Sequence, residues 1–112
     1  MLNYNNKTFK PVSSSENSET TSETVFIYQQ EGSIITSTYQ GGNIVKGHLI
    51  GLVDDNGIIN MRYHQIHING ELMTGTCVSK PEITLNGKIR LYEDWQWTSG
   101  DKSKGHSILE EI

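Results

Sequence analysis

Glu93 is the residue of this chain whose chemistry most needs an explanation. It lies in the segment Ile89-Arg90-Leu91-Tyr92-Glu93-Asp94-Trp95-Gln96-Trp97, where every second residue from Ile89 to Trp97 is apolar except Glu93 itself. In a strand these alternate residues share one face, so the carboxylate would point the same way as two tryptophans. A carboxylate on a buried face needs a hydrogen-bonding partner, a raised pKa or a ligand.

Further polar and aromatic residues are expected on the same face and complete a candidate ligand site. A mostly apolar cavity with a few convergent polar groups is typical of small-molecule sites. The candidate ligand-binding residues are Tyr39, Tyr63, Gln65, Glu93, Trp95 and Trp97. Two alternatives remain open: the tryptophans fill a packed core, or Glu93 joins a satisfied internal network or turns outward through a register slip.

The histidines and the single cysteine could carry metal or nucleophilic chemistry, but their spacing favours neither. His64 and His67 fall on opposite faces of a strand, whereas His48 and His64 are expected to pair outward across a hairpin. No carboxylate or thiolate joins that pair, and zinc needs three or four ligands. Cys77 has no evident cationic neighbour that would lower its pKa, so we interpret it as a small buried apolar residue. We assign no catalytic residue, no metal and no cofactor.

Strands are the elements that must position these residues. Alanine is absent from the 112 residues, while Ile, Thr and Val are abundant, which favours an all-β chain. Glycines recur at short intervals beside Asn, Asp or Gly, as is typical of the hairpins of a meander. The exception is the polar stretch 13–22, which contains no apolar residue and is expected to be a mobile loop.

Turn chemistry predicts which side chains share a face. If each turn is a three-residue loop that ends on glycine at positive φ, its flanking residues pair and have the same parity. The expected pairs are Gln29 with Ser33, Tyr39 with Asn43, Asp54 with Ile58, His67 with Glu71 and Thr84 with Lys88. All odd residues from Val25 to Trp97 then face inward. On this register Gly75 lies opposite both Trp97 and Tyr63, and Cys77 lies opposite both Trp95 and Met61, so that large side chains face small ones.

The pattern predicts about eight strands, each adjacent in sequence to the next. Their expected ranges are 7–12, 23–30, 33–40, 43–53, 58–67, 71–84, 88–98 and 105–111. Eight antiparallel strands close into an up-and-down barrel that has room for side chains or one small ligand. The alternative is an open sheet or half-barrel that dimerises through its edge, which a helix over residues 105–112 would favour.

Size and charge restrict the classes of partner. The length of 112 residues fits a single β-barrel domain over 1–112. The net charge of −4 argues against nucleic acid and anionic membrane surfaces as partners. One cysteine and a polar start without an apolar signal core lead us to expect a cytoplasmic protein.

Four segments resemble a family of small bacterial proteins that often carries the label N-acetylglutamate synthase. These segments are Asn3-Tyr4-Asn5-Asn6-Lys7-Thr8-Phe9, Gly47-His48-Leu49-Ile50-Gly51-Leu52-Val53, Met61-Arg62-Tyr63-His64-Gln65 and Tyr92-Glu93-Asp94-Trp95-Gln96-Trp97-Thr98-Ser99-Gly100-Asp101. The match covers almost the whole chain, and the last segment is the most distinctive. The resemblance implies an avidin-like or lipocalin-like barrel and a bacterial cytoplasmic origin, and it supplies no functional residues to transfer.

The label attached to that family implies acetyl transfer from acetyl-CoA. The common acetyltransferase fold binds the pyrophosphate with a Gly-x-Gly/Ala turn at the start of a helix. The nearest segment here, Gln40-Gly41-Gly42-Asn43, lies between two strand patterns and is better explained as a hairpin. Without that turn, the sequence offers no site for acetyl-CoA.

Three functions therefore remain. The first is a non-catalytic barrel that binds a small molecule in a polar-lined mouth. The second is a structural barrel without ligand that forms a homodimer through even-numbered apolar residues, namely Ile44, Ile50, Leu52, Ile66, Ile68 and Leu72. The third is an enzyme, for which no nucleophile–base pair is recognisable.

Overall fold

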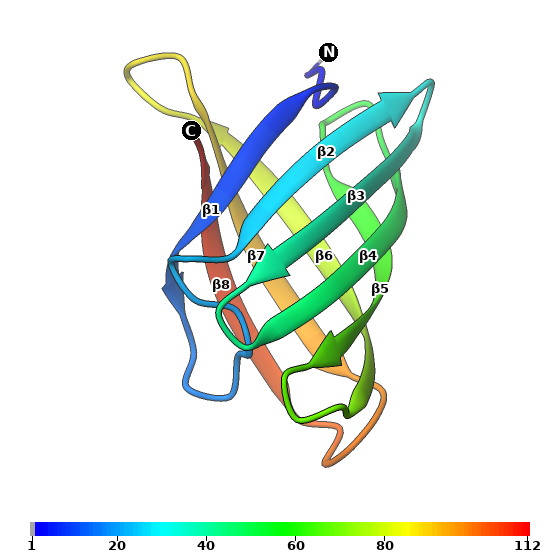
Figure 1. The fold of residues 1–112 in the computed structure, drawn as a ribbon. Helices are drawn as coiled ribbons and strands as arrows, with labels where there is room; N and C mark the ends of the chain where they lie inside the picture. The colour runs from blue at the N-terminus through cyan, green and yellow to red at the C-terminus, as the bar shows by residue number, and fades with distance from the viewer. Residues whose placement is uncertain (1) are drawn as a thin grey trace.

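A computed structural model describes residues 2–112, in which eight strands follow one another around a closed barrel (Figure 1). The strands are β1 (Lys7–Ser14), β2 (Val25–Glu31), β3 (Ile34–Gly41), β4 (Ile44–Val53), β5 (Ile59–His67), β6 (Leu72–Ile83), β7 (Ile89–Trp97) and β8 (Lys104–Glu111). Each pairs antiparallel with the next, and β8 pairs with β1. The predicted all-β up-and-down barrel is confirmed. The open sheet and the helix near the C-terminus are wrong, because β8 occupies that segment and closes the sheet.

The two ends of the barrel are closed differently (Figure 1). The terminal end carries both chain termini and the β2–β3, β4–β5 and β6–β7 turns. Here the buried Tyr4 donates a hydrogen bond from its hydroxyl to the Gly57 carbonyl at 2.6 Å, and its ring packs near Phe9 and Tyr28. The loop end carries the other four connections. Within residues 2–112 there is no helix, and therefore none that could cross a membrane.

The predicted odd-inward register is confirmed along β3, β5, β6 and β7 and along β4 from Gly47 onward. Leu49, Met61 and Leu91 are 3%, 2% and 0% exposed, while Lys46 and Arg62 face solvent. Three turns have the expected three-residue form. Their flanking backbone groups are hydrogen-bonded between Asp54 and Ile58, His67 and Glu71, and Thr84 and Lys88.

The prediction for β2 is wrong by one residue. Phe26 and Tyr28 face inward at 6% and 0% exposure, whereas Ile27 is 47% exposed and Gln29 is also outside. The reason is the β2–β3 turn, in which Glu31 pairs with Ile34, so that only two residues form the loop. Gly32 occupies the first of these with φ +62°, which is the glycine position of a two-residue turn. A loop shorter by one residue reverses the parity of the whole strand.

The start of β4 also departs from the prediction. Gly41 pairs with Ile44 instead of Tyr39 with Asn43, and bulges follow on both sides of the strand. As a result Ile44 is buried at 3% exposure, and Val45, expected inside, is 54% exposed. The bulges restore the odd-inward register from Gly47 onward.

Glycines create the room that the interior rings need, as the sequence predicts. Gly75 pairs with Tyr63 on β5 and with Trp97 on β7. A Cβ atom added at Gly75 would lie 2.2 Å from the Tyr63 hydroxyl and 2.8 Å from the Gln96 carbonyl oxygen. A Cβ atom added at Gly47 or at Gly105 would likewise lie 2.2 Å from the ring of Tyr39 or Trp95, respectively. The barrel therefore has no spare space at these positions.

We expect Gly75→Ala to lower the free energy of unfolding by about 1–3 kcal/mol, because the added methyl group overpacks a filled interior. The matched control is Thr76→Ala, which changes the next residue on the outer face and should cost less, about 1 kcal/mol at most. Urea denaturation of both variants makes the comparison. Equal stability of the two variants would contradict the packing argument.

Candidate functional site

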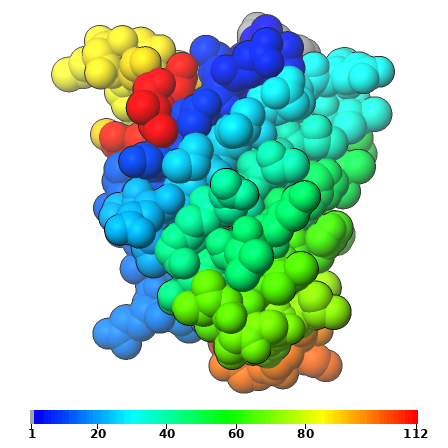
Figure 2. All heavy atoms as spheres, viewed as in Figure 1, coloured from blue at the N-terminus to red at the C-terminus, as the bar shows by residue number. Residues whose placement is uncertain are grey.

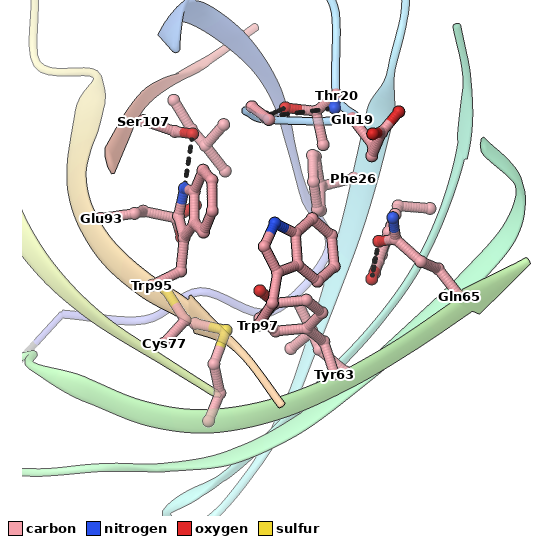
Figure 3. A pocket seen from close by; sticks show the side chains of 15 residues that line it. Glu19, Thr20, Phe26, Tyr63, Gln65, Cys77, Glu93, Trp95, Trp97 and Ser107 are labelled. Atoms are coloured by element: carbon pink, nitrogen blue, oxygen red, sulfur yellow. Dashed lines mark hydrogen bonds between the residues drawn. The ribbon is translucent and has the colours of Figure 1, made fainter. Parts of the chain in front are cut away.

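A small cavity lies inside the barrel toward the loop end (Figure 3). Its volume is about 50 Å³. All six residues that the sequence predicts for a ligand site line it: Tyr39, Tyr63, Gln65, Glu93, Trp95 and Trp97. The remaining lining residues come from other strands and from the β1–β2 connection, and they are Ser18, Glu19, Thr20, Phe26, Leu49, Met61, Cys77, Ser107 and Leu109.

A larger hollow of about 380 Å³ lies on the outside of the sheet, over β5 to β8. It is an open depression among outward-facing side chains that carry both signs of charge, such as Arg62, Asp94 and Lys104. Nothing encloses a ligand there. The interior cavity is therefore the candidate site.

The two tryptophans form one wall of the cavity, and each is held by a hydrogen bond. The indole N–H of Trp95 donates to the Ser107 hydroxyl at 3.0 Å, and that of Trp97 donates to the Asn17 carbonyl at 3.3 Å. Their ring centroids are 5.5 Å apart at an interplanar angle of 62°. Tyr63 meets Trp97 edge-on at 5.6 Å. These contacts fix the orientation of the rings without a ligand.

Gln65 lies on another side of the cavity (Figure 3), where it forms a polar pair with Tyr39. The Tyr39 hydroxyl donates to the Gln65 side-chain oxygen at 3.0 Å, and its ring stacks on Phe26 at 4.5 Å. Burial raises the pKa of Tyr39 well above its usual value, so the phenol stays neutral. This pair presents fixed dipoles and an aromatic surface, and no charge.

Glu93 is buried at 9% exposure with a single polar partner. The Ser79 hydroxyl donates a short hydrogen bond to one of its carboxylate oxygens. Burial raises the pKa of Glu93 to about 7, and the Ser79 hydrogen bond offsets only part of this effect. The carboxyl group therefore changes charge near neutral pH, inside the cavity.

The β1–β2 connection covers the mouth of the cavity. Asn17 donates from its side chain to the Ser103 hydroxyl and the Lys104 carbonyl, at 2.9 and 2.8 Å. The Glu19 carboxylate lies 3.0 Å from the His67 imidazole. These contacts connect the loop to the β7–β8 connection, the start of β8 and the end of β5. Its predicted mobility stays a prediction.

Four residues outside the predicted set also shape the site. The predicted parity of β2 puts Phe26 on the outer face, and the two-residue turn at Gly32 brings it inside. Ser79 and Ser107 both pair with Glu93, and the same register that placed Cys77 opposite Trp95 could have found Ser79. Glu19 lies in a connection without periodicity, so no sequence signal placed it at the mouth.

The other candidate residues lie where the strand pattern predicts. His48 and His64 pair on the outer face with ring centroids 5.4 Å apart. The described residues include no cluster of three or more His, Cys, Asp or Glu side chains that could hold a metal. Cys77 lies inside at 5% exposure, and burial raises its pKa well above its usual value, so the thiol is a poor nucleophile.

Comparison with known proteins agrees with this architecture. The model of the family described as avidin-like protein matches residues 2–112. The chain therefore belongs to the avidin-like family. No protein of curated function matches it.

The raised pKa of Glu93 has a measurable effect on stability. Between the usual carboxyl pKa of 4.5 and about 7, the folded protein binds more protons than the unfolded chain. The free energy of unfolding should therefore fall as the pH rises through this range, by on the order of 3 kcal/mol in total. Glu93→Gln should remove this slope and should be more stable than the unsubstituted protein at pH 8. Parallel pH profiles in urea denaturation would contradict the raised pKa.

Proposed function

We propose that the protein is a non-catalytic barrel that binds a small molecule in its interior cavity. The observation that carries this proposal is the cavity itself, where a buried carboxyl group lies beside two tryptophans whose orientations are already fixed. Binding sites are typically apolar, largely pre-formed and equipped with a few convergent polar groups. Membership of the avidin-like family supports the same reading.

The size of the cavity limits what it can take. Drug-sized ligands occupy roughly 300–1,000 Å³, far more than the about 50 Å³ present here. A water molecule needs about 10–15 Å³ by the same kind of measure, so there is room for about three to five small groups. The ligand is therefore a small molecule, or a longer one of which only a small head group lies in the cavity. The rest of a longer ligand would extend out through the mouth beneath the β1–β2 connection.

The second candidate function is a structural barrel without a ligand. The modest volume of the cavity and the dense glycine-to-ring contacts favour it. Acetyl transfer, which the resemblance suggested, has no support from an acetyl-CoA turn. The Cys77 thiol lies 3.9 Å from the neutral Ser79 hydroxyl, and burial raises its pKa, so the thiol is not activated as a nucleophile.

Filling the cavity tests the binding proposal. Leu109 lines the cavity at 1% exposure, so Leu109→Phe would place a phenyl ring in the available space. We expect tryptophan fluorescence of the unsubstituted protein to respond to members of a panel of neutral, anionic and cationic fragments. Leu109→Phe should bind the responding fragments at least about tenfold more weakly.

The matched control is the same substitution at Leu85, which is fully exposed in the β6–β7 turn and far from the cavity wall. Leu85→Phe should respond to the panel as the unsubstituted protein does. If no fragment of the panel changes the fluorescence of any of the three proteins, the binding proposal is wrong and the barrel has a structural function without a ligand.

We also propose that the protein forms a homodimer. Five of the six apolar residues expected on the outer face are exposed, namely Ile50, Leu52, Ile66, Ile68 and Leu72. Ile44 is buried instead, but Ile34 joins the group, because it pairs with Leu52 and is 47% exposed. The outer surfaces of β3 and β4 face the viewer in Figure 2, side by side. Exposed apolar side chains on adjacent strands favour self-association.

Sedimentation equilibrium at micromolar concentration tests the dimer. We expect twice the chain mass of 12.6 kDa. Leu52→Lys should shift the protein toward the monomer, because it places a charge in the apolar contact. Leu85→Lys, on the distant turn, should leave the mass unchanged. A monomer for the unsubstituted protein would contradict the proposal.

A further inference from the structure

The charged side chains that line the cavity are all acidic. Two carboxylates line it, Glu93 in the interior and Glu19 at the mouth, and its described lining residues include no lysine or arginine. Glu19 has a partner in the His67 imidazole at 3.0 Å. Glu93 has only the neutral hydroxyl of Ser79. The interior therefore holds an acidic group that no basic side chain neutralises.

The other titratable groups around Glu93 cannot neutralise it either. Its carboxylate contributes to raising the pKa of five groups, which are Tyr4 from the N-terminal segment, Tyr28 from β2, Tyr39 from β3, Tyr63 from β5 and Cys77 from β6. Four are phenols and one is a thiol, and none of them can carry a positive charge. From β6 and β8, the strands paired with β7, Glu93 is opposite Ser79 and Ser107, which do not titrate.

A second buried polar group, the Tyr28 hydroxyl, lies outside the lining of the cavity, toward the terminal end. The Tyr28 hydroxyl is fully buried and has no hydrogen-bond partner among the described residues. Burial and, second, the Glu93 carboxylate raise its pKa, so the two groups lie within electrostatic reach of each other. The Tyr28 phenol is neutral and cannot offset the charge of an ionised Glu93, which is costly inside a protein unless a further group provides a counter-charge.

The cavity walls supply a second kind of attraction for positive charge. Five of the lining residues are aromatic, namely Phe26, Tyr39, Tyr63, Trp95 and Trp97. The face of an aromatic ring carries negative electrostatic potential, and tryptophan binds cations best. In Figure 3 Glu93 lies beside Trp95, and Trp97 stands next to it.

We propose that the ligand of this cavity is a small organic cation with a substituted ammonium head group, whose charge lies against Glu93 and the faces of the tryptophan rings. This inference rests on the binding function proposed above and names its ligand class. A head group of about three to five non-hydrogen atoms matches the volume of about 50 Å³. The cation supplies the counter-charge that no basic residue of the lining provides.

Cation binding is coupled to proton release. The pKa of Glu93 in the unliganded protein is about 7, so at that pH the Glu93 side chain is protonated in half of the molecules. The cation binds the form in which Glu93 is ionised. Affinity should therefore rise with pH up to about 7 and level off above it, with binding about 30-fold tighter at pH 8 than at pH 5.5.

Choline and its neutral isostere, 3,3-dimethylbutan-1-ol, test the charge preference directly. They have the same shape, and they differ in the positive nitrogen. Titration of the full chain, followed by tryptophan fluorescence, should give a Kd for choline between about 10 µM and 10 mM and at least about tenfold weaker binding of the isostere. Tetramethylammonium and methylguanidinium, titrated in parallel, separate the ammonium head group from other cations.

Variants assign the effect to Glu93. Glu93→Gln should weaken choline binding by at least about tenfold, remove its pH dependence and leave the isostere unchanged. Asp94→Asn, the next residue on the outer face, should leave every value unchanged. If Glu93→Gln does not fold, the roughly 30-fold pH dependence of the unsubstituted protein makes the same test.

The outcomes distinguish the two proposals. Equal binding of choline and its isostere, a preference for methylguanidinium, or pH-independent choline affinity would overturn the ammonium proposal and leave the binding function intact. Absence of binding by cations together with a response to a neutral or anionic fragment would overturn it in the same way. No response to any fragment would overturn both.

Discussion

Pairing of β8 with β1 is the interaction on which the rest of the structure depends. It removes the edges of the sheet and fixes an interior that eight strands make just wide enough for side chains or one small ligand. Within that limit a large ring fits only where a small residue faces it, as Gly75, Gly47 and Gly105 do. The position of the cavity follows from closure and from these glycines together.

The interior changes in character along the barrel axis. Toward the terminal end, the rings of Tyr4, Phe9 and Tyr28 pack at centroid distances of 4.9 to 6.4 Å and fill the space. Toward the loop end, hydrogen bonds hold the indoles of Trp95 and Trp97 in place. Glu93 and Ser79 lie on paired positions of β7 and β6, where the Glu93 carboxyl group lines the cavity and affects the pKa of Tyr28. The proposed binding function thus rests on a wall whose geometry is already fixed without a ligand.

The polar β1–β2 connection has a structural part in the site although its sequence contains no periodic pattern. Through Asn17 it contacts both Trp97 and the start of β8, and through Glu19 it contacts the end of β5. Ser18, Glu19 and Thr20 line the cavity from this segment. The segment is therefore held by a few side-chain contacts at half-buried or exposed positions, where local opening motions usually occur.

Local rules in the sequence determined most of this architecture. Side-chain period two and three-residue turns at Gly57, Gly70 and Gly87 were sufficient to place Gln65, Glu93 and Trp97 on one face, because both rules act over a few residues. The tertiary structure decided the rest. Whether the loop at Gly32 has two or three residues depends on how β2 fits the closed barrel, and that choice turned Phe26 inward. The contacts of Glu93 with Ser79 and of Glu19 with His67 join residues far apart in the chain, and only the folded barrel brings them together.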